Sequence, residues 1–146
     1  MVTGHLLGVV DLVCVPESVA LAREYVRRKL GAGHPALDEV TLLVSEVVTN
    51  SVVHSDSRDG GTVTLALADC QDFVHVDVVD AGGESTPQVC HDPYAEGGRG
   101  LMLVDLMSKT WSVYEDEAGR TVWFEVAYER PPSPDVRDER AHPGSL

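Results

Sequence analysis

The sequence predicts an α/β fold built as a two-layer sandwich, with a mixed but mostly antiparallel sheet and helices packed on one of its faces. Apolar residues alternate with polar or small ones across residues 62–68 and again across 73–79, which indicates two strands with one packed face and one partly wet face. The short connection at 69–72 makes these strands antiparallel neighbours. Apolar residues recur at helical spacing in three other segments, and these supply the helical layer.

The N-terminal part is expected to form a strand and then a helix. Residues 6–15 are rich in β-branched side chains, as strands are. Pro16 suits the first position of a helix and Gly31 is a typical stop, so the sequence predicts a helix over residues 17–30. The basic run at residues 27–29 stands at the negative end of this helix. Compensation of the helix dipole is the favoured interpretation of this run, and contact with an acidic partner is the alternative.

A second helix is predicted over residues 36–54. Asp38 and Glu39 support its first turn, because acidic side chains are stabilising near a helix N-terminus. The glycine-containing linker at 31–35 precedes this helix, and the turn residues at 55–61 end it.

The second half of the chain begins with a long connection at residues 80–98, which contains four glycines and two prolines. Connections of this length are usually functional or disordered. A third helix is predicted over residues 99–108, and two more strands are predicted over 110–114 and 121–128. The prolines and mixed charges of residues 131–146 predict a disordered tail.

Size and composition narrow the class of protein. The chain has 146 residues, which is enough for one domain with a proper core, predicted over residues 1–130. A formal net charge of −13 and a pI near 4.6 argue against direct binding to nucleic acid or to an anionic membrane. No apolar stretch approaches the roughly 20 residues that cross a bilayer, and the N-terminus lacks the pattern of a signal peptide. We therefore expect a cytoplasmic protein.

Polar side chains border the apolar stripe of the second predicted helix. Glu46 and Asn50 lie one turn apart, and His54 follows one turn later. One interpretation is a solvated helix edge or a hydrogen bond between Glu46 and Asn50. The other is a functional pair, with Glu46 as a general base and Asn50 as an oxygen ligand for Mg²⁺ that arrives with a polyphosphate.

Two downstream motifs favour the functional interpretation. Asp80 ends a predicted strand just before Gly82, where a carboxylate can accept a hydrogen bond from an amino group such as that of adenine. Gly98, Arg99 and Gly100 open the third predicted helix, where free N–H groups and the positive helix end suit a phosphate. Each motif by itself has a simpler interpretation. The first can be an ordinary turn, and the second can be a turn before a helix with a solvated arginine.

The order of these motifs resembles the Bergerat-fold ATP-binding superfamily of gyrase, Hsp90, histidine-kinase and MutL type. The helix with Glu46 and Asn50 corresponds to its N box, and the later glycine motifs correspond to its two glycine boxes. The resemblance is closer still to the short anti-sigma-factor serine/threonine kinases common in actinobacteria. Motifs similar to those of these kinases occur at residues 45–54, 98–101 and 119–123.

The resemblance implies an ATP-binding regulatory protein, an anti-sigma-factor-type serine/threonine kinase that acts on an anti-anti-sigma partner with ATP and Mg²⁺. It implies that Asn50 binds Mg²⁺ and that Glu46 deprotonates the attacking hydroxyl. Asp80 would accept from the adenine amino group, and Thr121 would lie near the adenine. The other implied nucleotide-binding residues are Gly82, Gly98, Arg99, Gly100 and Leu101.

Glu84 departs from the family pattern, because it stands where the first glycine box often has a further glycine. An acid that faced a polyphosphate would be unfavourable. This departure supports an alternative function, a catalytically weak or inactive nucleotide-binding module that switches partners by binding. Retention of Glu46 favours the kinase. In either case the implied protein partners are a sigma factor or an anti-anti-sigma-like protein, while the role of His54 and a homodimeric state stay open.

Overall fold

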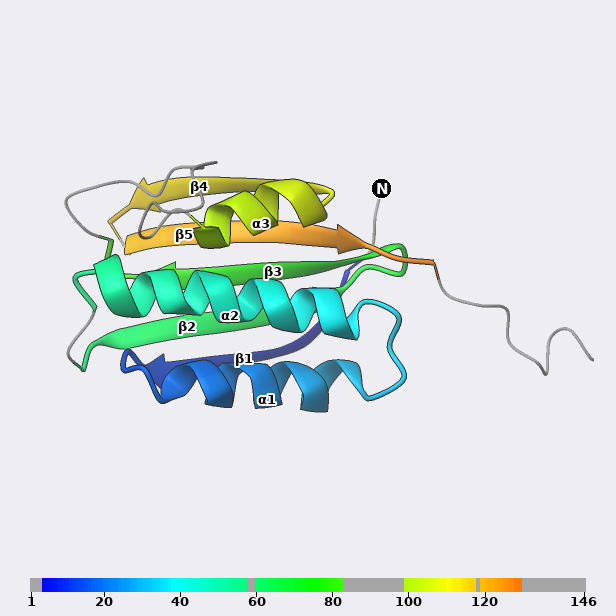
Figure 1. Ribbon diagram of the computed structural model, residues 1–146, viewed down its shortest axis with the longest axis horizontal. Helices are drawn as coiled ribbons and strands as arrows, with labels where there is room; N and C mark the ends of the chain where they lie inside the picture. Colours follow the sequence, from blue (N-terminus) through cyan, green and yellow to red (C-terminus); the bar gives the residue numbers. More distant parts are fainter. Residues whose placement is uncertain (1–3, 58–59, 83–98, 118, 130–146) are drawn as a thin grey trace, which may run out of the picture.

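In the part of the chain that the structure describes, three helices cover one face of a five-stranded sheet (Figure 1). The structure is a computed structural model that describes residues 4–57, 60–82, 99–117 and 119–129. Its strands are β1 (His5–Val13), β2 (Thr62–Asp69), β3 (Phe73–Asp80), β4 (Thr110–Asp116) and β5 (Gly119–Ala127). Its helices are α1 (Ser18–Leu30), α2 (Leu37–His54) and α3 (Arg99–Met107). The predicted two-layer fold is confirmed. No helix within the described ranges is long and apolar enough to span a membrane.

The sheet has the strand order β1-β2-β3-β5-β4, and every described pair is antiparallel. The predicted pairing of β2 with β3 is confirmed. β5 enters the sheet between β3 and β4, although β4 precedes it in the chain. This crossover brings the start of β5 beside the end of β3.

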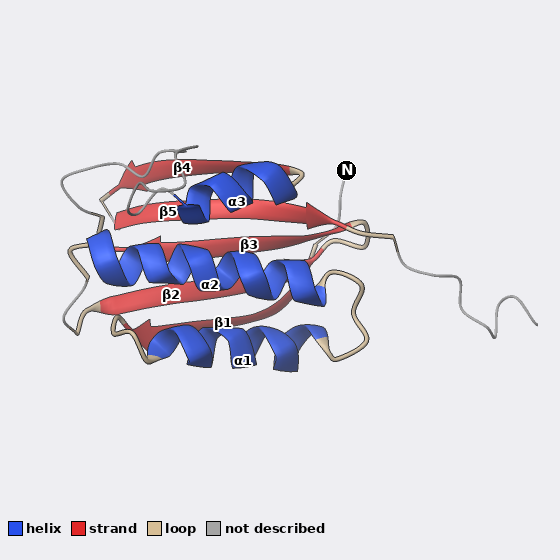
Figure 2. Ribbon diagram, viewed as in Figure 1, coloured by secondary structure: helices blue, strands red, loops and turns tan. Residues whose placement is uncertain are grey.

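The core lies between the sheet and the helices, all of which are on the same side (Figure 2). The sheet contributes alternating buried side chains from its central strands, including Val76 and Val78 of β3 and Val122 and Phe124 of β5. α2 packs against both neighbouring helices and against β3. The residues between these buried ones point to the open face of the sheet.

The β4–β5 connection is tighter than the sequence indicated. The two predicted strands left residues 115–120 as a turn, but the ladder continues until Asp116 pairs with Gly119. Gly119 has φ +132°, and a Cβ there would overlap the carbonyl oxygen of Asp80. A glycine is needed at this close approach, and it allows Arg120 to become a strand residue.

Candidate functional site

Asp80 is the centre of a buried polar cluster at the C-terminal end of β3. The residue is 5% exposed, and its carboxylate accepts hydrogen bonds from three directions. Ser51 Oγ, from α2, donates to Oδ2 at 2.5 Å, and the N–H of Gly82 donates to Oδ1 at 2.7 Å. Arg120 Nη2, from β5, donates to Oδ2 at 3.3 Å. The cluster therefore ties α2 to two adjacent strands.

Arg120 reaches this cluster because of strand register. The β3–β5 ladder places Asp80 directly opposite Arg120, and opposite residues of an antiparallel pair project from the same face. Val122, two residues along β5, lies on that face in the core. Arg120 is only 2% exposed, so its charge is compensated in the interior by the Asp80 carboxylate.

The same register places Thr121 on a different face from Arg120. Thr121 pairs with Val79 rather than with Asp80, so its side chain projects from the opposite face of the sheet, where it is 6% exposed. The position near the adenine that the resemblance implies for Thr121 stays a prediction, and Arg120 is the β5 residue that lies beside Asp80. The alternation of buried residues along β5 carried the signal that could have predicted this.

The turn after α2 holds the backbone that follows Asp80. The N–H of Asp56 donates to the Gly82 carbonyl at 2.6 Å, and the hydroxyl of Ser55 donates to the same oxygen at 3.3 Å. Ser57 Oγ accepts from the Ala81 N–H at 2.8 Å. Gly82 has φ +81°, a conformation that favours glycine. The segment predicted to face a flat ligand is thus fixed to the C-terminal end of α2.

Glu46 and Asn50 are both half-buried on α2, one turn apart. No hydrogen bond joins the two side chains, so the interpretation of Glu46 and Asn50 as a hydrogen-bonded pair is not supported. Asn50 Nδ2 is buried and has no hydrogen-bond partner among the described residues. A buried amide donor without an acceptor costs about 1–3 kcal/mol. His54 is exposed in the last turn of α2, where a cationic side chain suits the helix dipole.

These residues fit a bound magnesium–nucleotide group. A phosphate oxygen would satisfy the Asn50 amide N–H, and the amide oxygen of the same side chain is a ligand that Mg²⁺ accepts. Glu46 adds a carboxylate on the same side of the helix. Asp80 retains acceptor capacity on Oδ1, because an ionised carboxylate offers about four acceptor positions and three are used.

The predicted phosphate-binding motif is described in part. α3 begins at Arg99, as predicted, and continues through Gly100. Leu101 is fully buried in the core, so a contact from this residue to a ligand would come from its backbone. Gly98 and Glu84 lie outside the described residues.

Comparison with known proteins identifies the family. Residues 12–126 match the family described as the histidine kinase-like ATPase domain, which is most of the chain. The chain belongs to this family. The predicted resemblance to the Bergerat-fold proteins is therefore confirmed, and membership implies ATP as the nucleotide.

Several relatives share one name. The chain is 29% identical to the serine-protein kinase RsbW of Listeria monocytogenes serotype 4a (strain HCC23), over 89% of this chain and 93% of the relative. It is 28% identical to the serine-protein kinase RsbW of Bacillus subtilis (strain 168), over 73% and 76% of the two chains. A Mycobacterium tuberculosis crystal structure of RsbU and RsbW domains has a TM-score of 0.61 at 20% identity. The match covers 85% of this chain but spans only 33% of that one, and it shows the fold.

Two members of the site were not predicted from the sequence. Ser51 directly follows Asn50 and is 3% exposed, which places its hydroxyl on the inner side of α2. In the sequence, Arg120 stands only as part of a glycine-containing motif at residues 119–123. Both depend on contacts between residues far apart in the chain, so neither had a local motif.

Proposed function

We propose that this chain binds ATP with Mg²⁺ and transfers the γ-phosphoryl group to a serine of a small protein partner. It is an anti-sigma-factor-type kinase, whose partners are an anti-anti-sigma-like protein and a sigma factor. The observation that carries this proposal is the buried Asn50 Nδ2, one turn from Glu46, which has no hydrogen-bond partner in the described part of the chain. Membership of the ATPase family and the serine-protein kinase relatives support it.

Glu46 acts as the general base in this proposal. Its carboxylate accepts the proton of the serine hydroxyl while the hydroxyl oxygen forms a bond to the γ-phosphorus. The bond from that phosphorus to the β–γ bridging oxygen breaks, and ADP leaves. Phosphoryl transfer depends mainly on positioning of the reacting groups and on stabilisation of charge. A base held on a helix positions the attacking hydroxyl.

The remaining residues bind and orient the nucleotide. Asn50 holds the Mg²⁺, which supplies neutralisation of the phosphate charge. Asp80 accepts from the adenine amino group, and Gly82 leaves room for the base. Gly98, Arg99, Gly100 and the backbone of Leu101 bind phosphate at the start of α3.

Nucleotide binding by the Asn50→Ala variant tests the site assignment. Wild type is expected to bind ATP more tightly with Mg²⁺ than with EDTA, and the variant is expected to lose this difference. Thr49→Ala is the matched control, because Thr49 is exposed on the adjacent position of the same helix. Isothermal titration with and without the metal measures both, and an unchanged Mg²⁺ dependence in Asn50→Ala would contradict the assignment.

Label transfer from γ-labelled ATP tests the kinase activity. With small anti-anti-sigma-type proteins as acceptors, the wild type is expected to label a serine, and Glu46→Gln is expected to abolish the label while ATP still binds. Glu39→Gln removes an exposed carboxylate two turns earlier on α2 and is the control. Equal labelling by Glu46→Gln and wild type would exclude Glu46 as the base.

The alternative is a nucleotide-loaded module that switches partners without transfer. It is favoured by the sequence departure at Glu84, where an acid stands in place of a further glycine of the first glycine box. Tight nucleotide-dependent association with a partner, without label on that partner, is the result expected for this alternative.

A further inference from the structure

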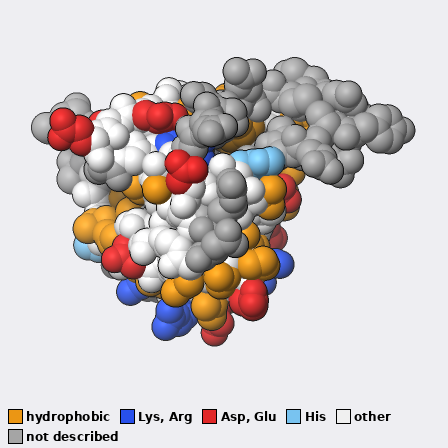
Figure 3. Space-filling model, turned by 90° about the vertical axis from the view of Figure 1, so that its left-hand side faces the viewer, with side chains coloured by type: hydrophobic (Ala, Val, Ile, Leu, Met, Phe, Trp, Pro, Cys, Tyr) orange, Lys and Arg blue, Asp and Glu red, His pale blue; other side chains and the backbone are white. Residues whose placement is uncertain are grey.

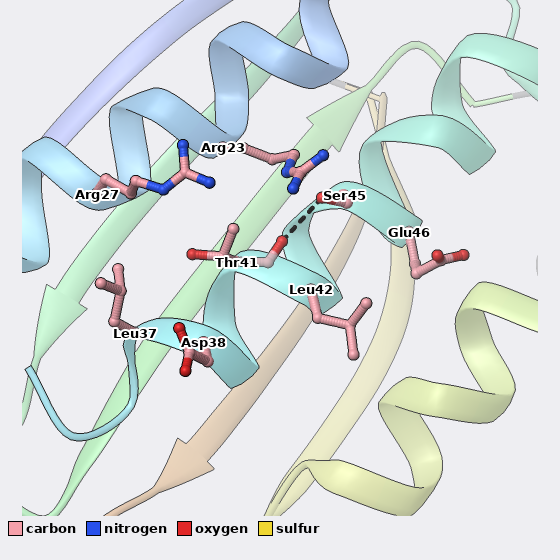
Figure 4. A pocket seen from close by; sticks show the side chains of 8 residues that line it. All are labelled: Arg23, Arg27, Leu37, Asp38, Thr41, Leu42, Ser45 and Glu46. Carbon is pink, nitrogen blue, oxygen red and sulfur yellow. Dashed lines mark hydrogen bonds between the residues drawn. The ribbon is translucent and has the colours of Figure 1, made fainter. Parts of the chain in front are cut away.

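A groove runs between α1 and α2 on the outer side of the helical layer (Figure 4). Its volume is about 340 Å³. Arg23 and Arg27 extend from α1 toward α2, and Thr41 extends from α2 toward α1, whereas Leu42 projects from the far side of α2 (Figure 4). The groove thus has a cationic wall that faces the Thr41 hydroxyl, and its lining also includes Asp38 and Glu46.

Among the residues that the structure describes, the two arginines have no carboxylate partner. Both are exposed, and no ion pair joins either of them to an acidic side chain in the described ranges. The helix dipole accounts for Arg27, which lies in the last turn of α1. It does not account for Arg23, because the effect of the dipole fades within one turn of the helix end. Arg23 and Arg27 stand one turn apart on the same face of α1, so they can bind two anionic groups side by side.

Thr41 supplies a second, independent observation. It is 8% exposed, its side chain points toward α1 at the floor of the groove, and its hydroxyl oxygen has no hydrogen-bond partner in the described structure (Figure 4). Buried hydroxyls are normally hydrogen-bonded. The neighbouring Ser45 hydroxyl is already used, since it donates to the Thr41 carbonyl at 2.9 Å. A polar ligand group in the groove would satisfy the Thr41 hydroxyl.

We propose that this groove binds an acidic segment of the protein whose serine is phosphorylated. Charge complementarity carries the choice of occupant. The chain has a net charge of −13, yet four of its 11 lysines and arginines lie on α1. Figure 3 shows Lys and Arg side chains at the lower edge of the molecule, where α1 lies, next to acidic side chains. An acidic partner is repelled by most of this protein and attracted by α1.

Two acidic residues of the groove restrict where that segment lies. Asp38 and Glu46 stand at opposite ends of the α2 wall, about 12 Å apart along the helix axis. Acidic side chains of the segment therefore bind midway, opposite Arg23 and Arg27. A segment bound in this way extends along α2 toward Glu46. A serine next to its acidic side chains therefore approaches the proposed base. In this respect the inference rests on the kinase function proposed above.

Direct binding of synthetic peptides tests the groove without any transfer reaction. The probe is a short fluorescein-labelled peptide with a serine between runs of aspartate. The control peptide carries asparagine in place of every aspartate. Fluorescence anisotropy is expected to show binding of the aspartate peptide and weakening as sodium chloride rises. The double variant Arg23→Gln/Arg27→Gln is expected to bind at least about tenfold more weakly, as for the loss of one strong charge-assisted contact.

Two controls separate this inference from the proposed function. Arg28→Gln removes a cation of the same helix that stacks over the Tyr25 ring, 5.6 Å from its centroid, and is expected to bind the peptide like wild type. Asn50→Ala is expected to bind the peptide normally while its ATP binding is impaired. The proposal is overturned if wild type does not bind the aspartate peptide, or binds the asparagine peptide equally well. Displacement by millimolar inorganic phosphate, or equal binding by the double variant, also overturns it.

Discussion

Replacing Arg120 by methionine tests the Asp80 cluster most directly. The substitution keeps an unbranched side chain of similar length but removes the guanidinium, and Asp80 then remains 5% exposed without a cation. Removing one partner of a buried ion pair costs about 3–5 kcal/mol. The contact of 3.3 Å between Nη2 and Oδ2 is long for a charge-assisted hydrogen bond, so we expect the lower end, about 3 kcal/mol. This is a large part of the roughly 5–15 kcal/mol that stabilises a typical domain.

Urea unfolding followed by circular dichroism measures this loss. With a denaturant slope of about 1–3 kcal/mol/M, the midpoint of Arg120→Met is expected to fall by about 1–3 M. The double variant Asp80→Asn/Arg120→Met is expected to recover much of the stability, because a neutral amide does not require a cation and can still bond to Ser51. The double-mutant cycle then gives the coupling between the two side chains.

Two results would refute this account of the cluster. One is a loss of less than about 1 kcal/mol in Arg120→Met, which would mean that the buried Asp80 side chain does not depend on the arginine. The other is additivity of the two single variants, which would mean that the buried pair makes no coupled contribution.

Three further outcomes follow from other features. Thr41→Val is expected to raise the free energy of unfolding by about 1 kcal/mol, since it removes a buried hydroxyl without a partner in the described structure; a clear loss in urea unfolding would contradict this. Gly119→Ala is expected to cost about 1–3 kcal/mol or more in the same assay, because of its positive φ and the overlap with Asp80; wild-type stability would show that the turn can rearrange. Hydrogen bonding to Asp77, opposed by burial and assisted by Glu125, raises the pKa of His75 from 6.5 to about 8. The folded pKa is above the unfolded one, so this stabilisation is complete below about pH 6.5 and is lost as the pH rises through about 8. Solvent screening of this partly exposed group reduces its size to about 1 kcal/mol, and unfolding of wild type and His75→Gln across that range measures it; parallel pH profiles would refute it.

Much of the fold was predictable because it depends on local pattern. The period-two alternation of β2 and β3 and the helical spacing of α2 predicted their bounds to within one or two residues. The helical period also predicted that Glu46 and Asn50 share one side of α2. Motif order predicted the family, since the glycine motifs must follow the helix in that fold.

What the sequence by itself determined was therefore the set of elements, the motif residues that each carries, and the family. The tertiary structure decided which residues from different elements meet. Arg120 faces Asp80, and Thr121 does not, because a tight β4–β5 turn and the β3–β5 register select one face of β5. A shift of one residue in that register would exchange the two. The alternation along β5 indicates which face Arg120 shares with Val122, but the β3 residue that it meets depends on the register. The groove likewise exists only because α1 and α2 pack side by side, which places Arg23 and Arg27 opposite Thr41. Local periodicity sets the direction of a side chain on its own element, whereas its partners depend on packing across the whole chain.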